Sequence, residues 1–380
     1  MAGTQRPPVL VVVQLSGGND FMNTVIPYTN RTYYESRQTV FVPQEQVLPI
    51  DETVAFHPSM APFLELYGQG AVAIVQGIGY PNSSRSHFRG MDIWHTCEPE
   101  AVSTEGWLAK AIRDLDPRKE NVLTGVNFSA GLPRAMAAPG VPVTSVGDLD
   151  NYGLMTSISE SHQRDEALTI FKHMYGPAVG TGPVMEYLAQ TGLDVLGGAD
   201  LLKKAPARYS SDVEYANNPL ARSLRDVARV HLADMGTRIF YTSQGGYDTH
   251  AYENPTQPRL LADLSGAVMD FIHDLRDHNR SEEVVILVFT EFGRRMRDNG
   301  SGTDHGSGGG AFIIGDGVEG GLYAEYPPLD PGQWLNGEDL RHTIDFRGVY
   351  GTLLEQWMNI EPRHIVGGAF EQIQPFKEGG

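Results

Sequence analysis

The sequence predicts an α/β fold with a mostly parallel central sheet. Several strand-length runs of valine, isoleucine and leucine are unbroken by polar residues, which is typical of strands buried on both faces. A helical pattern of apolar residues lies between two of these runs, as in a strand–helix–strand unit. Short polar motifs follow the runs, and in such sheets ligands bind beyond the carboxyl ends of the strands.

The predicted elements occur along the whole chain. Strands are expected at residues 9–15, 71–76, 237–242, 284–290 and 311–315. Helices are expected at residues 58–67, 159–175, 183–196, 219–235, 257–278 and 346–358. The helix at 257–278 has apolar side chains at helical spacing and connects the third and fourth strands.

The segment 98–218 differs from the rest of the chain. It combines a loop rich in glycine and proline at 131–147 with polar helices. Because strand-end motifs resume after it, we expect one domain over residues 1–380, with 98–218 as an inserted cap. A second glycine-rich stretch at 298–310 is expected to be a functional loop, since it contains His305 and long loops in compact domains are often functional.

Composition excludes several classes of protein. The 380 residues are 41% apolar, which is ample for a packed core, and the net charge is −18. This charge argues against binding to nucleic acid, whose phosphates need clustered cations, and against docking to anionic membranes. Cys97 is the only cysteine, so an internal disulfide is excluded. No run approaches the ~20 apolar residues of a membrane helix.

Six acidic and histidine side chains near the ends of the predicted strands indicate a metal site. They are Asp20, Asp248, His250, Glu291, Asp304 and His305. Carboxylates and imidazoles suit Zn²⁺ and related ions, and a pair of such ions can hold both the attacking and the leaving oxygen in phosphoryl transfer. One or two divalent ions are therefore expected as cofactors, with Zn²⁺ preferred to Mn²⁺, Mg²⁺, Ca²⁺ or Fe.

Each of these residues also has a purely structural interpretation. Asp20 could cap a turn or a helix after the first strand. Glu291 could form a surface salt bridge with Arg294 or Arg295, and His305 could be an ordinary loop histidine. The metal-site interpretation depends on the recurrence of such residues after successive strands.

A candidate nucleophile follows the second predicted strand. Ser86 is preferred and Ser84 is the alternative, because a serine near a metal is deprotonated more easily. Arg85 or Arg89 could hold anionic oxygens, and His87 could be a ligand, a base or an orienting group. The competing interpretation makes Ser86 the N-cap of a following helix.

Five motifs together resemble a known family. They are Ser16-Gly17-Gly18-Asn19-Asp20, Arg85-Ser86-His87-Phe88, Thr290-Glu291-Phe292-Gly293-Arg294, Thr303-Asp304-His305-Gly306 and Thr343-Ile344-Asp345-Phe346-Arg347. In this order they resemble domain-of-unknown-function family 1501, whose members are similar to the alkaline phosphatase and sulfatase superfamily. The resemblance implies an alkaline-phosphatase-like three-layer sandwich.

The resemblance also implies roles for individual residues. Asp20 would bind one metal, Asp248 and His250 the other, and Ser86 would be the nucleophile. His305 would be the last histidine ligand. Phe292 stands beside Glu291, where the superfamily usually has a histidine, and Asp304 could compensate for that missing ligand.

These patterns predict a metal-dependent hydrolase of phosphate or sulfate esters that acts on a small anionic substrate. The nucleophile would be a serine or metal-activated water. The alternatives are a metal-dependent enzyme of another substrate class and a non-catalytic binding protein on the same fold. Members of the family commonly carry an export signal and residues 1–8 show none, so the chain is expected to be a mature exported form or cytoplasmic. The sequence leaves the oligomeric state open.

Overall fold

The computed structural model describes most of the chain. The described residues are 6–147, 149, 150, 163, 166, 169, 170, 198, 201, 202 and 204–377. The helices predicted at 159–175 and 183–196 lie largely outside these residues. The helix predicted at 219–235 is present as α7 (Pro219–Leu232).

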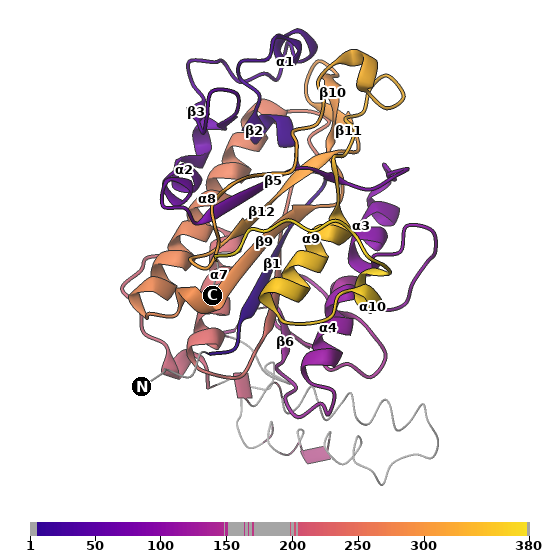
Figure 1. The fold of residues 1–380 in the computed structure, drawn as a ribbon. Coiled ribbons are helices and arrows are strands. Elements are labelled where there is room, and N and C mark those ends of the chain that lie inside the picture. The colour runs from indigo at the N-terminus through magenta and orange to yellow at the C-terminus, as the bar shows by residue number, and fades with distance from the viewer. Residues whose placement is uncertain are drawn as a thin grey trace.

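A nine-stranded sheet forms the centre of the described molecule (Figure 1). Its strand order is β13-β5-β12-β9-β1-β8-β6-β7, and β14 also pairs with β5. The strands are β1 (Val9–Ser16), β5 (Val72–Gly79), β6 (Gly125–Asn127), β7 (Thr144–Ser145), β8 (Ile239–Gly245), β9 (Val284–Thr290), β12 (Gly309–Ile314), β13 (Gly321–Tyr323) and β14 (Ile344–Asp345).

The sheet is mostly parallel, so the predicted fold class is confirmed. β1 pairs in parallel with β8 and with β9, and β8 continues in parallel to β6 and β7. β12 is the exception, because it runs antiparallel to both of its neighbours, β5 and β9. The five strands predicted from apolar runs are all present in this sheet, within a few residues of their expected ends.

Helices cover both faces of the sheet, which makes three layers (Figure 1). One face packs against α2 (Ala61–Gly68), α7 and α8 (Glu253–Asp277). The other packs against α3 (His87–Thr96), α4 (Trp107–Leu115), α9 (Phe346–Thr352) and α10 (Arg363–Val366). α9 continues into a π-helical turn, Leu353–Trp357, within the predicted last helix.

Strand β1 shows why the apolar runs are continuous. Val9, Val11 and Val13 belong to the core on the side of α7 and α8, whereas Leu10 and Val12 belong to the core on the side of α3 and α9. Successive side chains of a strand point to opposite faces, and here both faces are covered. The side chains of residues 9–13 are therefore all apolar.

The region expected to be an inserted cap contributes to the core. α4 packs under the sheet, and β6 and β7 extend the sheet beyond β8. The short strands were missed because Gly125–Asn127 and Thr144–Ser145 carry no apolar run of strand length. The bounds of the inserted cap stay a prediction, and within them α4, β6 and β7 belong to the sheet and its cover.

A hairpin replaces the long loop expected at 298–310. β10 (Arg294–Asp298) pairs with β11 (Thr303–His305) in the antiparallel sense. Close packing explains the glycines at 302 and 306, because a Cβ would lie 2.0 Å from the Thr249 carbonyl oxygen at the first and 2.5 Å from the Arg294 carbonyl carbon at the second. This part of the chain is held against its neighbours by backbone contact.

A smaller three-stranded sheet and a short helix lie beside the carboxyl end of β1. The sheet contains β2 (Val25–Ile26), β3 (Leu48–Pro49) and β4 (Ala55–Phe56), and the helix is α1 (Arg31–Ser36). Over the described part of the chain, no helix has the length and apolar character needed to cross a membrane.

We predict that His57 makes the fold sensitive to acid. Its Nδ1 accepts the Ser59 N–H at 3.1 Å, and burial lowers the pKa of His57 to about 4. Because the unfolded chain takes up this proton at pH ~6.5, the contribution of His57 to stability is complete above that pH and is lost as the pH falls toward 4. At 1.36 kcal/mol per pKa unit, the loss between pH 7.5 and pH 5 is roughly 2 kcal/mol.

Urea unfolding of the wild type and His57→Asn at both pH values tests this prediction. Asparagine can still cap the turn but does not titrate, so the variant should lose correspondingly less stability in acid. His273→Asn, at an exposed position of α8, is the control and should behave as the wild type. Equal losses in the wild type and His57→Asn would contradict the prediction.

Candidate metal centre and its cavity

Three adjacent parallel strands deliver the candidate site to one edge of the sheet. β9, β1 and β8 are neighbours, and their carboxyl ends lead to Glu291, Gly17 and Asp248 respectively. The Gly17 N–H donates to Glu291 Oε1 at 2.9 Å, which joins two of the loops directly. The strand-end motifs therefore meet although they are separated by hundreds of residues.

Glycine is required at the turn after β1. Gly17 has a φ of +124°, and a Cβ there would lie 2.4 Å from the Asp248 nitrogen. At Gly18 a Cβ would lie 2.3 Å from the Phe292 ring. Only residues without a side chain allow the loops after β1, β8 and β9 to approach this closely.

The fully buried Arg294 guanidinium ties these loops together. It donates to the carbonyls of Gly18 (2.7 Å), Thr303 (2.7 Å) and Tyr247 (2.8 Å), and to Asp248 Oδ1 (2.9 Å). It also donates to the Gly17 carbonyl. Arg294 therefore fixes the Asp248 carboxylate relative to the ends of β1 and β8.

Three imidazoles converge on this carboxylate, and each has an acceptor at its Nδ1. Glu291 Oε1 lies 2.9 Å from His87 Nδ1, and Asp304 Oδ1 lies 2.9 Å from His250 Nδ1. The Arg85 carbonyl oxygen lies 2.7 Å from His305 Nδ1. Because ionised carboxylates and carbonyls can only accept, the proton of each neutral ring is on Nδ1.

The three Nε2 atoms point toward Asp248. They lie 3.3 Å (His87), 3.2 Å (His250) and 2.9 Å (His305) from its oxygens. The Nε2 atoms of His250 and His305 are 2.9 Å apart. Ligand atoms of His87, Asp248 and His305 all lie within 4.8 Å of one another.

This donor set fits a divalent cation. With Nδ1 protonated, three nitrogen lone pairs lie against the oxygens of one carboxylate, which is unfavourable unless protons or a cation lie between them. Three imidazoles and a carboxylate suit Zn²⁺. Carboxylate or carbonyl partners on the second ring nitrogen are the usual way in which proteins orient such ligands.

The charges around the cluster shift its pKa values. The hydrogen bond with Glu291 raises the pKa of His87. Burial raises the pKa of Asp248, but its contacts with His305 and Arg294 outweigh burial and hold that pKa well below its usual range. The hydrogen bond with His250 lowers the pKa of Asp304. Asp248 and Asp304 are therefore anionic at neutral pH.

Asp20 has a different environment from the other five predicted ligands. It is fully buried and forms an ion pair with Arg37, and its Oδ1 accepts the Met22 N–H at 3.2 Å as an N-cap. Burial raises the pKa of Asp20, but Arg37 outweighs burial and lowers it. This is the structural interpretation left open for Asp20, and a metal role there would have to compete with Arg37.

The predicted nucleophile lies outside the donor set. Ser86 is exposed, and it is the N-cap of α3 by backbone geometry although its side chain makes no capping bond. The Ser84 hydroxyl accepts the Ser86 N–H at 3.3 Å. Arg85 forms an ion pair with Asp339. Arg89 forms an ion pair with Asp92 and donates hydrogen bonds to the carbonyls of Glu98 and Pro99. Both arginines are therefore already engaged.

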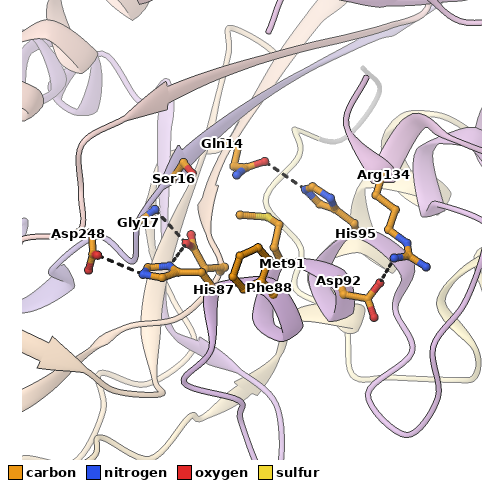
Figure 2. Close-up of a pocket in the computed structure, with 11 residues that line it drawn as sticks. Gln14, Ser16, Gly17, His87, Phe88, Met91, Asp92, His95, Arg134 and Asp248 are labelled. Carbon is orange, nitrogen blue, oxygen red and sulfur yellow. Dashed lines mark hydrogen bonds and ion pairs between the residues drawn. The ribbon is translucent and has the colours of Figure 1, made fainter. Parts of the chain in front are cut away.

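A cavity of about 530 Å³ opens beside the cluster (Figure 2). Its walls are Gln14, Ser16, Gly17, His87, Phe88, Met91, Asp92, His95, Arg134, Asp248 and Glu291. Gln14, His95 and Arg134 could not be found from the sequence, because they lie inside β1, near the end of α3 and at the start of the 3₁₀ helix Arg134–Met136. The helical spacing of His87, Met91 and His95 is the one pattern that could have indicated a shared wall.

The family model for proteins of unknown function DUF1501 matches residues 50–347. The chain belongs to the DUF1501 family. This confirms the resemblance found in its motifs. No protein with a curated description matches the sequence.

Solved structures of similar fold come from the alkaline phosphatase and sulfatase superfamily. A superfamily protein of Vibrio parahaemolyticus is 11% identical, with 96% of this chain and 69% of that chain covered and a TM-score of 0.43. A sulfatase of Pseudoalteromonas sp. is 10% identical, with 97% and 71% covered and a TM-score of 0.43. The phosphonate monoester hydrolase of Agrobacterium radiobacter is 10% identical, with 98% and 78% covered and a TM-score of 0.39.

We predict that Asp20 and Asp248 respond oppositely to loss of charge. Asp20→Asn leaves Arg37 buried without its carboxylate partner, and breaking such a pair costs roughly 3–5 kcal/mol of unfolding free energy. Metal stoichiometry should not change. Asp248→Asn should lose metal binding with little change in the stability of the metal-free protein, because Arg294 keeps its carbonyl acceptors.

Urea unfolding in chelator and metal analysis after reloading measure the two effects. Arg37→Met combined with Asp20→Asn removes both charges and should recover part of the lost stability. Loss of bound metal in Asp20→Asn, with the fold intact by circular dichroism, would instead make Asp20 a ligand.

Proposed function

We propose that this chain is a metal-dependent hydrolase of phosphate or sulfate esters. The observation that carries the proposal is the convergence of three imidazole Nε2 atoms on Asp248 at 2.9–3.3 Å, beside a cavity. His87, Asp248, His250 and His305 would hold the ion, with Zn²⁺ the expected one. When bound, a divalent ion supplies Lewis acidity and lowers the pKa of water.

The surrounding residues would keep the ligands in place during turnover. Glu291 and Asp304 accept the Nδ1–H of His87 and His250, so each ring keeps the tautomer that offers Nε2. The Arg85 carbonyl does the same for His305. Arg294 pairs with the Asp248 carboxylate and keeps it in position. The ligands are thus oriented before any substrate arrives, which reduces reorganisation during reaction.

The position of Ser86 favours water as the nucleophile. Ser86 is exposed and is absent from the cavity wall, whereas His87, Asp248 and Glu291 line it. A water molecule in the cavity could reach an ester held there without any movement of α3. The serine mechanism, in which the predicted nucleophile Ser86 attacks the ester, requires the start of α3 to turn inward.

Metal titration tests the donor set. Chelator-treated protein should take up Zn²⁺ in isothermal titration, and His250→Ala and His305→Ala should abolish tight binding. Asp304→Ala, which removes the acceptor at His250 Nδ1, should weaken binding by about 10–100-fold. His364→Ala, an exposed histidine paired with Asp114, is the control and should bind as the wild type. Undiminished binding in both His250→Ala and His305→Ala would refute the proposed ligands.

A substrate screen tests the reaction. Zn²⁺-loaded protein is assayed against chromogenic phosphate monoesters, phosphate diesters and sulfate esters, with Mn²⁺ as a second metal. Turnover that disappears with chelator and returns with metal is the expected result. Bound metal without turnover on any of the three ester classes would favour the other readings, an enzyme of another substrate class or a binding protein.

We predict that Ser86→Ala retains turnover in that assay. With water as the nucleophile, removal of an exposed hydroxyl should change kcat less than about threefold, since surface substitutions away from a site have small effects. Ser84→Ala is the matched control for the neighbouring alternative. Loss of turnover in Ser86→Ala, with metal content and melting temperature unchanged, would instead identify Ser86 as the nucleophile.

A further inference from the structure

The cavity runs along α3 and away from the metal ligands. His87, Met91 and His95 are spaced four residues apart and line it together, as residues on one face of a helix do. Eight residues of helix span about 12 Å, so His95 marks a far end distinct from the reactive end at His87. A molecule in the cavity therefore meets three environments in order (Figure 2).

The middle of the cavity is apolar and unusually exposed. Phe88 is 92% exposed, the highest value among the large apolar side chains described as exposed. No ring contact to Phe88 is found within the described residues. Met91, one helical turn further along, lines the same wall, and methionine side chains adapt readily in shape. A flat apolar group placed here would cover Phe88 and remove its exposed surface from water.

The far end of the cavity is polar but carries no free positive charge. His95 Nε2 lies 3.1 Å from Gln14 Oε1 and 3.1 Å from the Tyr241 hydroxyl. Burial lowers the pKa of His95 to about 3, so the ring is neutral. The Arg134 guanidinium is committed to Asp92 at 2.9 Å and to the Ser103 carbonyl. A second anionic group on the ligand would therefore find no partner.

We propose that this cavity binds the leaving group of the ester, and that this group is an uncharged aromatic alcohol with a small polar substituent at its far end. The ester would lie at His87 and Asp248, the ring against Phe88 and Met91, and the substituent near Gln14 and His95. This rests on the proposed function for the reaction at the ester. Recognition of the alcohol depends only on the cavity.

The charges argue against the other common phosphate esters. Arg134 is paired with Asp92, so the additional phosphates of a nucleoside diphosphate would lose water in the cavity without gaining a positive partner. A sugar would place hydroxyl groups against Phe88 and Met91, where these groups would lose hydrogen bonds to water without replacement. A ring with one polar end matches the order of the three environments.

Binding of the free alcohol to metal-free protein tests the proposal without any turnover. The probe is 4-methylumbelliferone, measured by its fluorescence in the presence of chelator. Phe88→Ala and Met91→Ala should each weaken binding by about five- to tenfold, as expected for loss of one aromatic or sulfur–aromatic contact. Phe41→Ala is the matched control, because Phe41 is 39% exposed and packs near Tyr34, away from the cavity.

Three outcomes of the binding experiment test the aromatic site separately from the proposed hydrolase function. Saturable binding that is weakened in both cavity variants and unchanged in Phe41→Ala supports the aromatic site, whether or not metal is later found to support turnover. Absence of saturable binding, or equal binding in all variants, overturns the aromatic site even if esters are hydrolysed. Competition by glucose at equal concentration would likewise overturn it in favour of a carbohydrate site.

A kinetic comparison extends the test to active protein. Phenyl-type and glycerol esters of whichever acid is hydrolysed are compared by kcat/KM. Phe88→Ala should lower kcat/KM for the phenyl-type ester by about five- to tenfold and leave the glycerol ester within twofold. An equal loss on both esters would show that Phe88 supports the fold or the metal centre, and would refute its role in selecting the alcohol.

Discussion

The arrangement of the candidate site depends on one buried cation, Arg294. Its guanidinium donates to carbonyls in the loops after β1 and β8 and in β11, and also to the Asp248 carboxylate. These segments are distant in sequence, and glycines at positions 17 and 18 bring their backbones into contact. A buried guanidinium without acceptors is costly, so the loops and the arginine fix each other.

The second constraint is electrostatic and follows from the first. With Asp248 fixed and anionic, three histidines whose Nδ1 atoms face acceptors direct their Nε2 atoms toward its carboxylate oxygens. Such an arrangement is stable in water only with protons or a cation at its centre. Any ion that binds the folded state alone adds stability through mass action, so metal content and fold stability would be coupled here.

Much of this architecture could be predicted from the sequence because its signals are local. The buried strands are apolar runs, and polar residues at their ends must lie at one edge of a parallel sheet.

Contacts between side chains that are far apart in the sequence have no such local signal. Arg37, the partner of Asp20, is the C-cap of α1, and Arg134 reaches the cavity from the start of the 3₁₀ helix Arg134–Met136. The strands β6 and β7 are too short to show a pattern, and the glycines at 302 and 306 serve close packing instead of flexibility.

Helix α3 separates the two tasks of the proposed site. Its first residue, His87, faces the sheet edge and belongs to the metal cluster, while Phe88, Met91 and His95 form the wall beyond it. The helix is held independently of any ligand, because Ile93 and Trp94 pack in the core beneath the sheet. Substitutions at Phe88 and Met91 would therefore change what the cavity accepts while His87 keeps its place, so selectivity for the alcohol could vary on this scaffold without loss of the chemistry at Asp248.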